Sequence, residues 1–352
     1  MYQGRPVAYT YDMDDLPMVS VIMPVRDEGA YIERSLGAVL RQDYPAERTE
    51  ILVVDGMSTD GTREFIRARQ IVYPRLRLLD NPRRIVPPGL NIGIAQARGD
   101  IIVRVDGHCE IAPDYISRCV EHLLADDVEA VGGPIETVGE TEEARAIALA
   151  MSSWFGVGGS AFRTVKDRPA LVETVAFPAY LRQTLERLGP FDEQLVRNQD
   201  DEYNYRLLKS GGRILLSPDI RSRYYSRSGL RSLWRQYYQY GYWKVRVMQK
   251  HPRQMRWRQF VPPVFVAGLL GSTIPGLFFR PFRWLAAAII GLYLVADMFA
   301  SLSLGREHGH RYIPRLLIIH PVLHLSYGLG FLAGLLNYAS LRQSGTRPDN
   351  GS

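Results

Sequence analysis

The stretch IIVRVDGHCE, residues 101–110, decides how the rest of the chain is interpreted. Its first five residues are mostly β-branched and apolar, which is typical of a strand buried on both faces of a sheet. The run then stops at Asp106, Gly107 and His108. In open parallel sheets, ligands bind just outside the carboxyl ends of the strands. A carboxylate and an imidazole at this place suit one divalent cation, although Asp-Gly by itself is also common turn chemistry.

Strand-like and helix-like patterns alternate along the N-terminal half of the chain. The apolar runs expected as strands are residues 19–25, 50–55, 76–79, 101–105 and 128–131, with a last short strand at 213–217. Helical patterns separate most of them. This alternation predicts an α/β fold with a doubly wound, mostly parallel sheet and right-handed crossovers.

Acidic residues follow three of the expected strands. Asp55 and Asp106 stand at strand ends, and Glu28 comes just after the first strand. Because the carboxyl ends of parallel strands meet at one edge of a sheet, we expect these groups to lie together beside a ligand rich in hydroxyl and nitrogen groups. Neither a phosphate-binding GxxxxGK(S/T) loop nor a GxGxxG turn follows the first strand, which excludes P-loop and dinucleotide-binding proteins.

Long apolar stretches are concentrated near the C-terminus, at residues 261–279, 284–304 and 316–336. Each has about 20 residues, the length that spans a hydrocarbon core of about 30 Å. We expect three membrane helices, or two spans and a re-entrant segment, because three prolines interrupt the first stretch: Pro262, Pro263 and Pro275. Asp297 is the one charged residue in the second stretch. We interpret His320 and His324 in the third as interfacial or helix-packing residues rather than ligands.

The net charge of +6 is unevenly distributed. No Asp or Glu occurs at residues 220–296, and eleven Lys and Arg residues lie between Arg221 and Arg258, ahead of the first apolar stretch. A basic helix expected at 232–250 is also dense in Tyr and Trp, which are enriched at membrane interfaces. We therefore expect an anionic lipid surface as the partner of this region and no nucleic acid. Residues 1–17 have no apolar core, which predicts no signal peptide and a cytoplasmic N-terminal part.

Three motifs, VIMPVRDE at 21–28, VVDGMSTDGT at 53–62 and VDGH at 105–108, together resemble the family 2 inverting glycosyltransferases, which have the Rossmann-like GT-A fold. The chain departs from that family's usual motifs at Gly56 and Met57, and His108 stands where the second Asp of the metal motif is usual. The resemblance implies that the nucleotide sugar is bound by Pro24, Val25, Glu28, Asp55 and Asp106. It also implies that Asp106 and His108 hold a divalent cation, Mn²⁺ or Mg²⁺, on the diphosphate.

A further acidic motif, QDDE at 199–202, is followed by Arg206 and is similar to the family's catalytic motif. The resemblance implies that Asp200 is the base that deprotonates the acceptor hydroxyl. A carboxylate at a helix N-terminus is stabilised by the helix dipole and can accept that proton. The alternative is that these residues only cap the helix.

The segment QYYQY at 236–240 occupies the place of the family's QxxRW motif, with the Arg and Trp both changed. The resemblance implies that Gln236, Gln239 and Tyr240 contact the acceptor, and the changes disfavour a processive polysaccharide synthase. Other segments resemble the membrane-anchored, succinoglycan-type exopolysaccharide glycosyltransferases: NP at 81–82, GLNIG at 89–93, GVGGS at 156–160, NQDDE at 198–202 and QYGYW at 239–243.

The resemblance implies a metal-dependent hexosyltransferase that moves a hexose from a nucleotide-diphosphate sugar, UDP-glucose or UDP-galactose, to a saccharide on a polyprenyl diphosphate. This reaction would serve exopolysaccharide or cell-surface glycan synthesis. One alternative is transfer to polyprenyl phosphate itself. Another is a catalytically silent membrane subunit that binds nucleotide sugar.

We expect five regions along the chain. They are an N-terminal tail at 1–17, a GT-A catalytic domain at 18–228, a basic aromatic interfacial region at 229–259, a membrane domain with about three apolar helices at 260–338 and a disordered tail at 339–352. The expected location is the inner membrane of a bacterial or archaeal cell, multi-pass, with the catalytic domain in the cytoplasm.

Overall fold

The computed structural model describes residues 16–159, 167–226 and 229–344, and the chain forms two compact units. The first unit comprises Met1–Glu136 with Ala161–Tyr224, and the second comprises Thr137–Ser160 with Tyr225–Ser352. The expected catalytic domain at 18–228 is thus not one continuous stretch of the first unit. Residues 137–160 belong to the second unit, together with the C-terminal helices. The expected tails at 1–17 and 339–352 lie largely outside the described residues.

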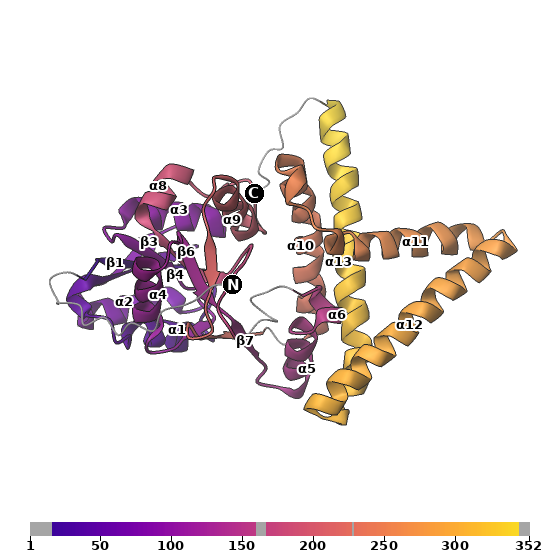
Figure 1. The fold of residues 1–352 in the computed structure, drawn as a ribbon, viewed down its shortest axis with the longest axis horizontal. Helices are drawn as coiled ribbons and strands as arrows, with labels where there is room; N and C mark the ends of the chain where they lie inside the picture. Colours follow the sequence, from indigo (N-terminus) through magenta and orange to yellow (C-terminus); the bar gives the residue numbers. More distant parts are fainter. Residues whose placement is uncertain (1–15, 160–166, 227–228, 345–352) are drawn as a thin grey trace. The chain divides into compact units, whose positions relative to one another are not determined.

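The first unit is built from alternating strands and helices (Figure 1). From residue 19 to residue 104, these are β1 (Val19–Val25), α1 (Ile32–Leu40), β2 (Thr49–Asp55), α2 (Thr62–Val72), β3 (Leu76–Asp80), α3 (Val86–Gln96) and β4 (Ile101–Arg104). The elements that follow are β5 (Cys109–Ile111), α4 (Tyr115–Ala125), β6 (Ala130–Gly133), β7 (Ile135–Val138), β8 (Ala170–Leu171), β9 (Ala176–Leu181), α8 (Arg182–Leu188), α9 (Gln199–Lys209), β10 (Ile214–Leu216) and β11 (Ser222–Tyr225).

Eight strands form the main sheet, in the order β3-β2-β1-β4-β9-β6-β10-β8. The first four are parallel to one another, as the alternating pattern predicts. The register pairs Val25 at the end of β1 with Asp55 at the end of β2. These two predicted ligand-binding residues therefore lie side by side at the carboxyl ends of neighbouring strands. Three short strands form a second sheet in the order β5-β11-β7, which the sequence patterns did not predict.

Both faces of the main sheet are buried. On one face Val21 of β1 packs in a cluster with Leu36 of α1 and Ile116 of α4. On the other face Ile22 packs with Leu90 of α3 and Leu207 of α9. Helices on both faces explain why the strands are continuous apolar runs rather than alternating ones. Cys109 and Cys119 are buried and form no disulfide.

The strand β9 is not among the expected strands, and it runs antiparallel to both β4 and β6 inside the sheet. Its sequence contains Pro178, which normally argues against an interior strand. The ladder between β9 and β6 is irregular, with Ala179 opposite Val131 and Ala176 opposite Gly133. Pro178 therefore lies where the chain bulges and gives up no regular ladder hydrogen bond.

The second unit is helical within the residues described. It comprises α5 (Glu142–Met151), α6 (Trp154–Val157), α10 (Leu230–Lys250), α11 (Val261–Gly276), α12 (Arg280–His308) and α13 (Ile313–Ser344) (Figure 1). The helix expected at 232–250 is confirmed as α10. The last helix extends to Ser344, beyond residue 339 where a tail was expected.

Glycines allow α10 and α13 to approach closely. A Cβ on Gly241 of α10 would collide with the carbonyl oxygen of Tyr327, and one on Gly330 of α13 with that of Tyr238. Small residues at such crossings are typical of helix pairs in membranes, where close backbone packing replaces the hydrophobic effect.

Two helical stretches in the described part of the chain are long and apolar enough to cross a membrane, Arg280–His308 and His310–Tyr338, each of 29 residues. The first expected span, by contrast, contributes α11, which has 16 residues and contains Pro275. At a rise of about 1.5 Å per residue, such a helix is about 24 Å long, shorter than the hydrocarbon core.

Candidate active site

The carboxyl ends of β1, β2 and β4 carry most of the predicted site residues. Pro24 and Val25 are the last two residues of β1 and are paired with Val54 and Asp55 of β2. Glu28 lies in the loop that follows β1, and Asp106 and His108 follow β4. The strand order places β1 between β2 and β4, so these loops are neighbours as predicted.

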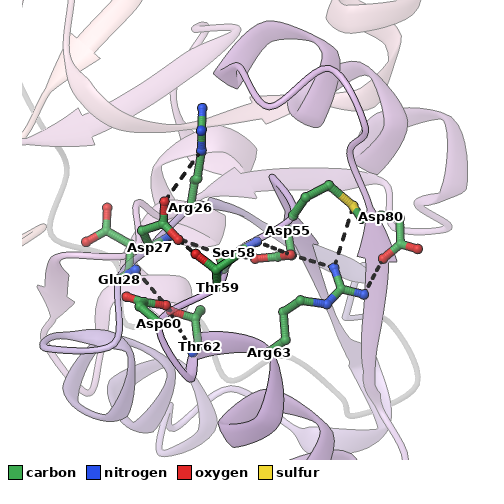
Figure 2. Close-up of polar contacts among 11 residues, drawn as sticks. Arg26, Asp27, Glu28, Asp55, Ser58, Thr59, Asp60, Thr62, Arg63 and Asp80 are labelled. Atoms are coloured by element: carbon green, nitrogen blue, oxygen red, sulfur yellow. Dashed lines mark hydrogen bonds and ion pairs between the residues drawn. The ribbon is translucent and has the colours of Figure 1, made fainter.

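Asp55 is completely buried, and its carboxylate is held by the chain itself (Figure 2). Ser58 donates to it through the backbone N–H at 3.0 Å and through the hydroxyl at 2.5 Å. Arg63 donates to the same carboxylate at 2.5 Å and reaches Asp80 at 2.6 Å with its other terminal nitrogen. Asp55 is therefore fixed in one orientation by partners, Ser58 and Arg63, that the motif analysis did not identify.

Hydrogen bonds connect the loop after β1 with the segment after β2 (Figure 2). In the two bonds described here, backbone N–H groups after β1 donate to side chains after β2. The Glu28 N–H donates to the Thr62 hydroxyl at 3.0 Å, and the Gly29 N–H donates to Asp60 at 2.7 Å. Burial opposes ionisation of Asp60, but the hydrogen bonds from Thr62 and Gly29 prevail and hold its pKa below the ordinary value. These bonds fix the position of Glu28 relative to β2.

Glu28 also positions His108. The Nδ1 atom of His108 lies 2.9 Å from a carboxylate oxygen of Glu28, and the ring edge packs against Tyr224 with centroids 5.0 Å apart. A carboxylate at Nδ1 favours the tautomer that leaves Nε2 as the available nitrogen. Gly107 is required between the two motif residues, because a Cβ there would lie 2.8 Å from Cγ of Glu28.

A buried arginine that the motif analysis did not identify connects Asp106 with Asp200. Arg104, the last residue of β4, directs Nε to one oxygen of Asp106 at 2.9 Å and Nη2 to the other at 3.2 Å. Its Nη1 donates to Asp200, which lies in the first turn of α9. A charged residue two positions before Asp106 in an apolar strand, and so on the same face, is the sequence feature that could have identified it.

Asp200 has a pKa raised above its ordinary value. Desolvation is the largest cause, and the nearby Arg104 opposes it by stabilising the ionised form. The neighbouring Glu202 has a structural role: it pairs with Arg206 at 2.8 Å, and Arg206 donates to the backbone oxygens of Leu188 and Pro190. The acidic motif thus separates into a carboxylate at the sheet edge and a helix-anchoring ion pair.

The predicted acceptor-binding residues lie on α10 of the second unit and are described only within it. Gln236 donates to the hydroxyl of Tyr240 at 3.0 Å, and Tyr240 packs edge-on against Tyr237 with centroids 5.5 Å apart. Within the described residues, no group of three or more His, Cys, Asp and Glu side chains is arranged to hold a metal ion.

Comparison with known proteins places this chain in a family. The model of "Glycosyl transferase family 2" matches residues 20–189. The chain is 30% identical to the succinoglycan biosynthesis protein ExoA of Rhizobium meliloti (strain 1021) over 336 residues, 92% of this chain and 98% of the relative. It is 29% identical over 329 residues to the dolichyl N-acetyl-alpha-D-glucosaminyl phosphate 3-beta-D-2,3-diacetamido-2,3-dideoxy-beta-D-glucuronosyltransferase of Methanococcus voltae, covering 90% of this chain and 97% of that protein.

A solved structure shares the fold. The mannosyltransferase PcManGT from Pyrobaculum calidifontis, solved in complex with GDP-Man and Mn²⁺, matches with a TM-score of 0.60 at 20% identity. The match covers 95% of this chain and 91% of that one. The predicted GT-A fold is confirmed.

Proposed function

Because the chain belongs to glycosyl transferase family 2, we propose that it transfers a hexose from a nucleotide-diphosphate sugar to a lipid-linked saccharide. The donor in this proposal is UDP-glucose or UDP-galactose, the acceptor is a saccharide on a polyprenyl diphosphate, and the product enters exopolysaccharide or cell-surface glycan synthesis. The observation that carries the proposal is the link from Asp106 through Arg104 to Asp200, since it joins a donor-side carboxylate to an acceptor-side one.

In this proposal the nucleoside binds beside Asp55, with Pro24, Val25 and Glu28 forming the adjoining strand end and loop. Asp55 is rigidly held by Ser58 and Arg63, so little conformational freedom is lost when a nucleoside binds.

Asp106 and His108 are the residues proposed to hold a divalent cation. A carboxylate with a neutral imidazole suits Mn²⁺, and the contact of Nδ1 with Glu28 is the outer-shell arrangement usual for metal-bound histidine. The described residues offer two ligands rather than a complete set, which fits a cation whose other ligands are phosphate oxygens and water. When bound, such a cation would offset the charge on the departing nucleotide.

Asp200 is the proposed base. Its carboxylate accepts the proton of the acceptor hydroxyl while that oxygen forms a bond to the anomeric carbon. The bond between the anomeric carbon and the diphosphate oxygen breaks on the opposite face, so an α-linked donor gives a β-linked product. Arg104 supports this role because its positive charge favours the ionised, proton-accepting form of Asp200.

The second unit would anchor the protein in the membrane that holds the lipid-linked acceptor. We propose α12 and α13 as membrane spans and α11 as a segment that does not cross, in a multi-pass protein of a bacterial or archaeal inner membrane with the first unit in the cytoplasm. Gln236, Gln239 and Tyr240 on the aromatic helix α10 are the proposed acceptor contacts.

The test incubates membranes that contain the protein with a panel of radiolabelled nucleotide sugars and lipid-linked acceptors, followed by product analysis. Replacing the base by the isosteric amide, Asp200→Asn, should lower transfer by about 10²–10⁴-fold while UDP binding is retained. Substantial transfer by this variant would refute the assignment of the base.

The same assay decides between the alternative functions. Labelled product on polyprenyl phosphate alone would favour the phosphate as acceptor, and no turnover of any donor would favour a silent subunit.

A further inference from the structure

Arg104 lies in surroundings where an unpaired charge is strongly disfavoured. It ends the apolar strand β4, and its side chain is only 8% exposed. A buried guanidinium is tolerated when its donors are satisfied by carboxylates in good geometry. Arg104 meets this condition with two carboxylates rather than one, from Asp106 two residues away and Asp200 on α9.

The geometry of this contact requires arginine. Two nitrogens of one planar group address the two oxygens of Asp106, while the third addresses Asp200. An ammonium group is a point charge and cannot form this fork. The rigid guanidinium therefore sets the position of the carboxylate on α9 relative to the carboxylate that follows β4.

The same carboxylate oxygens are those that a cation would use. Each oxygen of Asp106 has two lone pairs, so Arg104 leaves acceptor capacity for a metal. The guanidinium and a divalent cation nevertheless repel each other across the carboxylate that they share. A cation arriving at Asp106 thus weakens the fork of Arg104 on that side and leaves its contact with Asp200.

We infer that Arg104 is a positioning residue that couples the two halves of the site: it competes with the cation for Asp106 and holds Asp200 in place for the acceptor. This inference rests on the proposed function, since it takes Asp106 as a metal ligand and Asp200 as the base. It assigns no proton transfer to Arg104 itself.

The experiment compares the full-length wild-type chain with Arg104→Gln and Arg104→Lys. Mn²⁺ affinity is measured by electron paramagnetic resonance, with Mn²⁺ alone and with Mn²⁺ plus UDP, and transfer kinetics are measured in parallel. Arg104→Gln should bind Mn²⁺ more tightly than the wild type, because a repelling charge is removed. Its kcat should fall about 10- to 100-fold through misplacement of the base.

Arg104→Lys separates charge from geometry. It keeps the positive charge, so Mn²⁺ affinity should stay at the wild-type value, but it cannot form the fork, so kcat should remain reduced. Arg182→Gln is the matched control, because Arg182 donates to the Gly99 backbone oxygen at 2.6 Å, near the opposite end of β4, and should leave both readouts unchanged.

Unchanged or weakened Mn²⁺ binding by a folded Arg104→Gln protein, or an unchanged kcat in either variant, would overturn the inference. If Arg104→Gln does not fold, the kcat of Arg104→Lys decides. Failure of the proposed function is distinguishable: the wild type would then transfer no sugar from any donor, while the Mn²⁺ measurements would still report on competition at Asp106.

Discussion

Two arginines control the carboxylates at the edge of the main sheet. Arg63 fixes Asp55, the proposed nucleoside contact, and Arg104 links Asp106, the proposed metal ligand, with Asp200, the proposed base. Asp55 is completely buried, so its charge needs a permanent partner. At the scale of single residues, the site is a set of carboxylates whose orientation depends on side chains outside the recognised motifs.

Removing Arg63 tests this dependence. In Arg63→Met the buried Asp55 keeps Ser58 but loses its counter-charge, which should destabilise the fold by about 3 kcal/mol and weaken UDP binding. Thermal unfolding and UDP titration measure the two effects. Arg67→Met, at an exposed position of the same helix, is the control and should change neither. An unchanged melting temperature in Arg63→Met would show that Ser58 alone satisfies Asp55.

At the scale of elements, α12 and α13 share a buried polar contact. Nδ1 of His320 lies 2.7 Å from Asp297, both residues are fully buried, and Ser301 donates to the same carboxylate at 3.1 Å. His324, one turn along α13, accepts from Tyr293 on Nδ1 and donates from Nε2 to the Phe155 backbone oxygen, each at 2.9 Å. The two histidines interpreted from sequence as packing residues therefore have specific polar partners, which fix how the helices are aligned.

This buried contact should matter by fixing the alignment of α12 with α13 rather than by adding net stability. Asp297→Leu or His320→Leu alone removes one partner of a buried pair, leaves the other with Ser301 only, and should cost about 3–5 kcal/mol. The double leucine variant should recover most of that stability. Thermal unfolding in detergent measures the effect, with His308→Leu at the exposed end of α12 as control. A double variant as unstable as the worse single variant would contradict this interpretation.

At the scale of the whole molecule, the chain is divided into an α/β unit and a helical unit. The two units are not consecutive in sequence, because α5 lies between segments of the α/β unit in the chain but packs on α13 of the helical unit. Ala146 and Ile147 of α5 lie in one cluster with Leu316 and Ile319, and Glu142 pairs with Arg315 at 2.8 Å. Within the second unit, 17% of the most apolar window of Arg280–His308 is buried, so most of its apolar surface is exposed.

Global stability should depend on pH through His122, which lies between Asp126 at 2.9 Å and Asp219 at 3.0 Å. Burial alone would lower the pKa of His122, but the two carboxylates outweigh it and raise the pKa above 6.5. Burial likewise opposes ionisation of Asp219, but the hydrogen bond from His122 prevails and lowers its pKa from 3.8 to about 2.

The direction of the effect follows from these shifts. The contribution of His122 is fully present below pH 6.5 and is lost as the pH rises through its raised pKa. That of Asp219 is present above pH 3.8 and is lost as the pH falls through about 2. The melting temperature of the wild type should therefore decline above pH 6.5 more than that of His122→Gln. Parallel profiles for the two proteins would refute the prediction, and His310→Gln, at an exposed position, should follow the wild type.

The sequence by itself determined the alternating α/β architecture, the sheet edge at Asp55 and Asp106, and the helix α10, because these depend on local periodicity and on strand ends that meet wherever strands are parallel. Only the tertiary structure decided the antiparallel place of β9, the assignment of residues 137–160 to the second unit, and the partners of Asp297, Arg63 and Arg104. Those features depend on contacts between residues far apart in the chain, such as Arg104 with Asp200, and no local pattern encodes a partner 96 positions away.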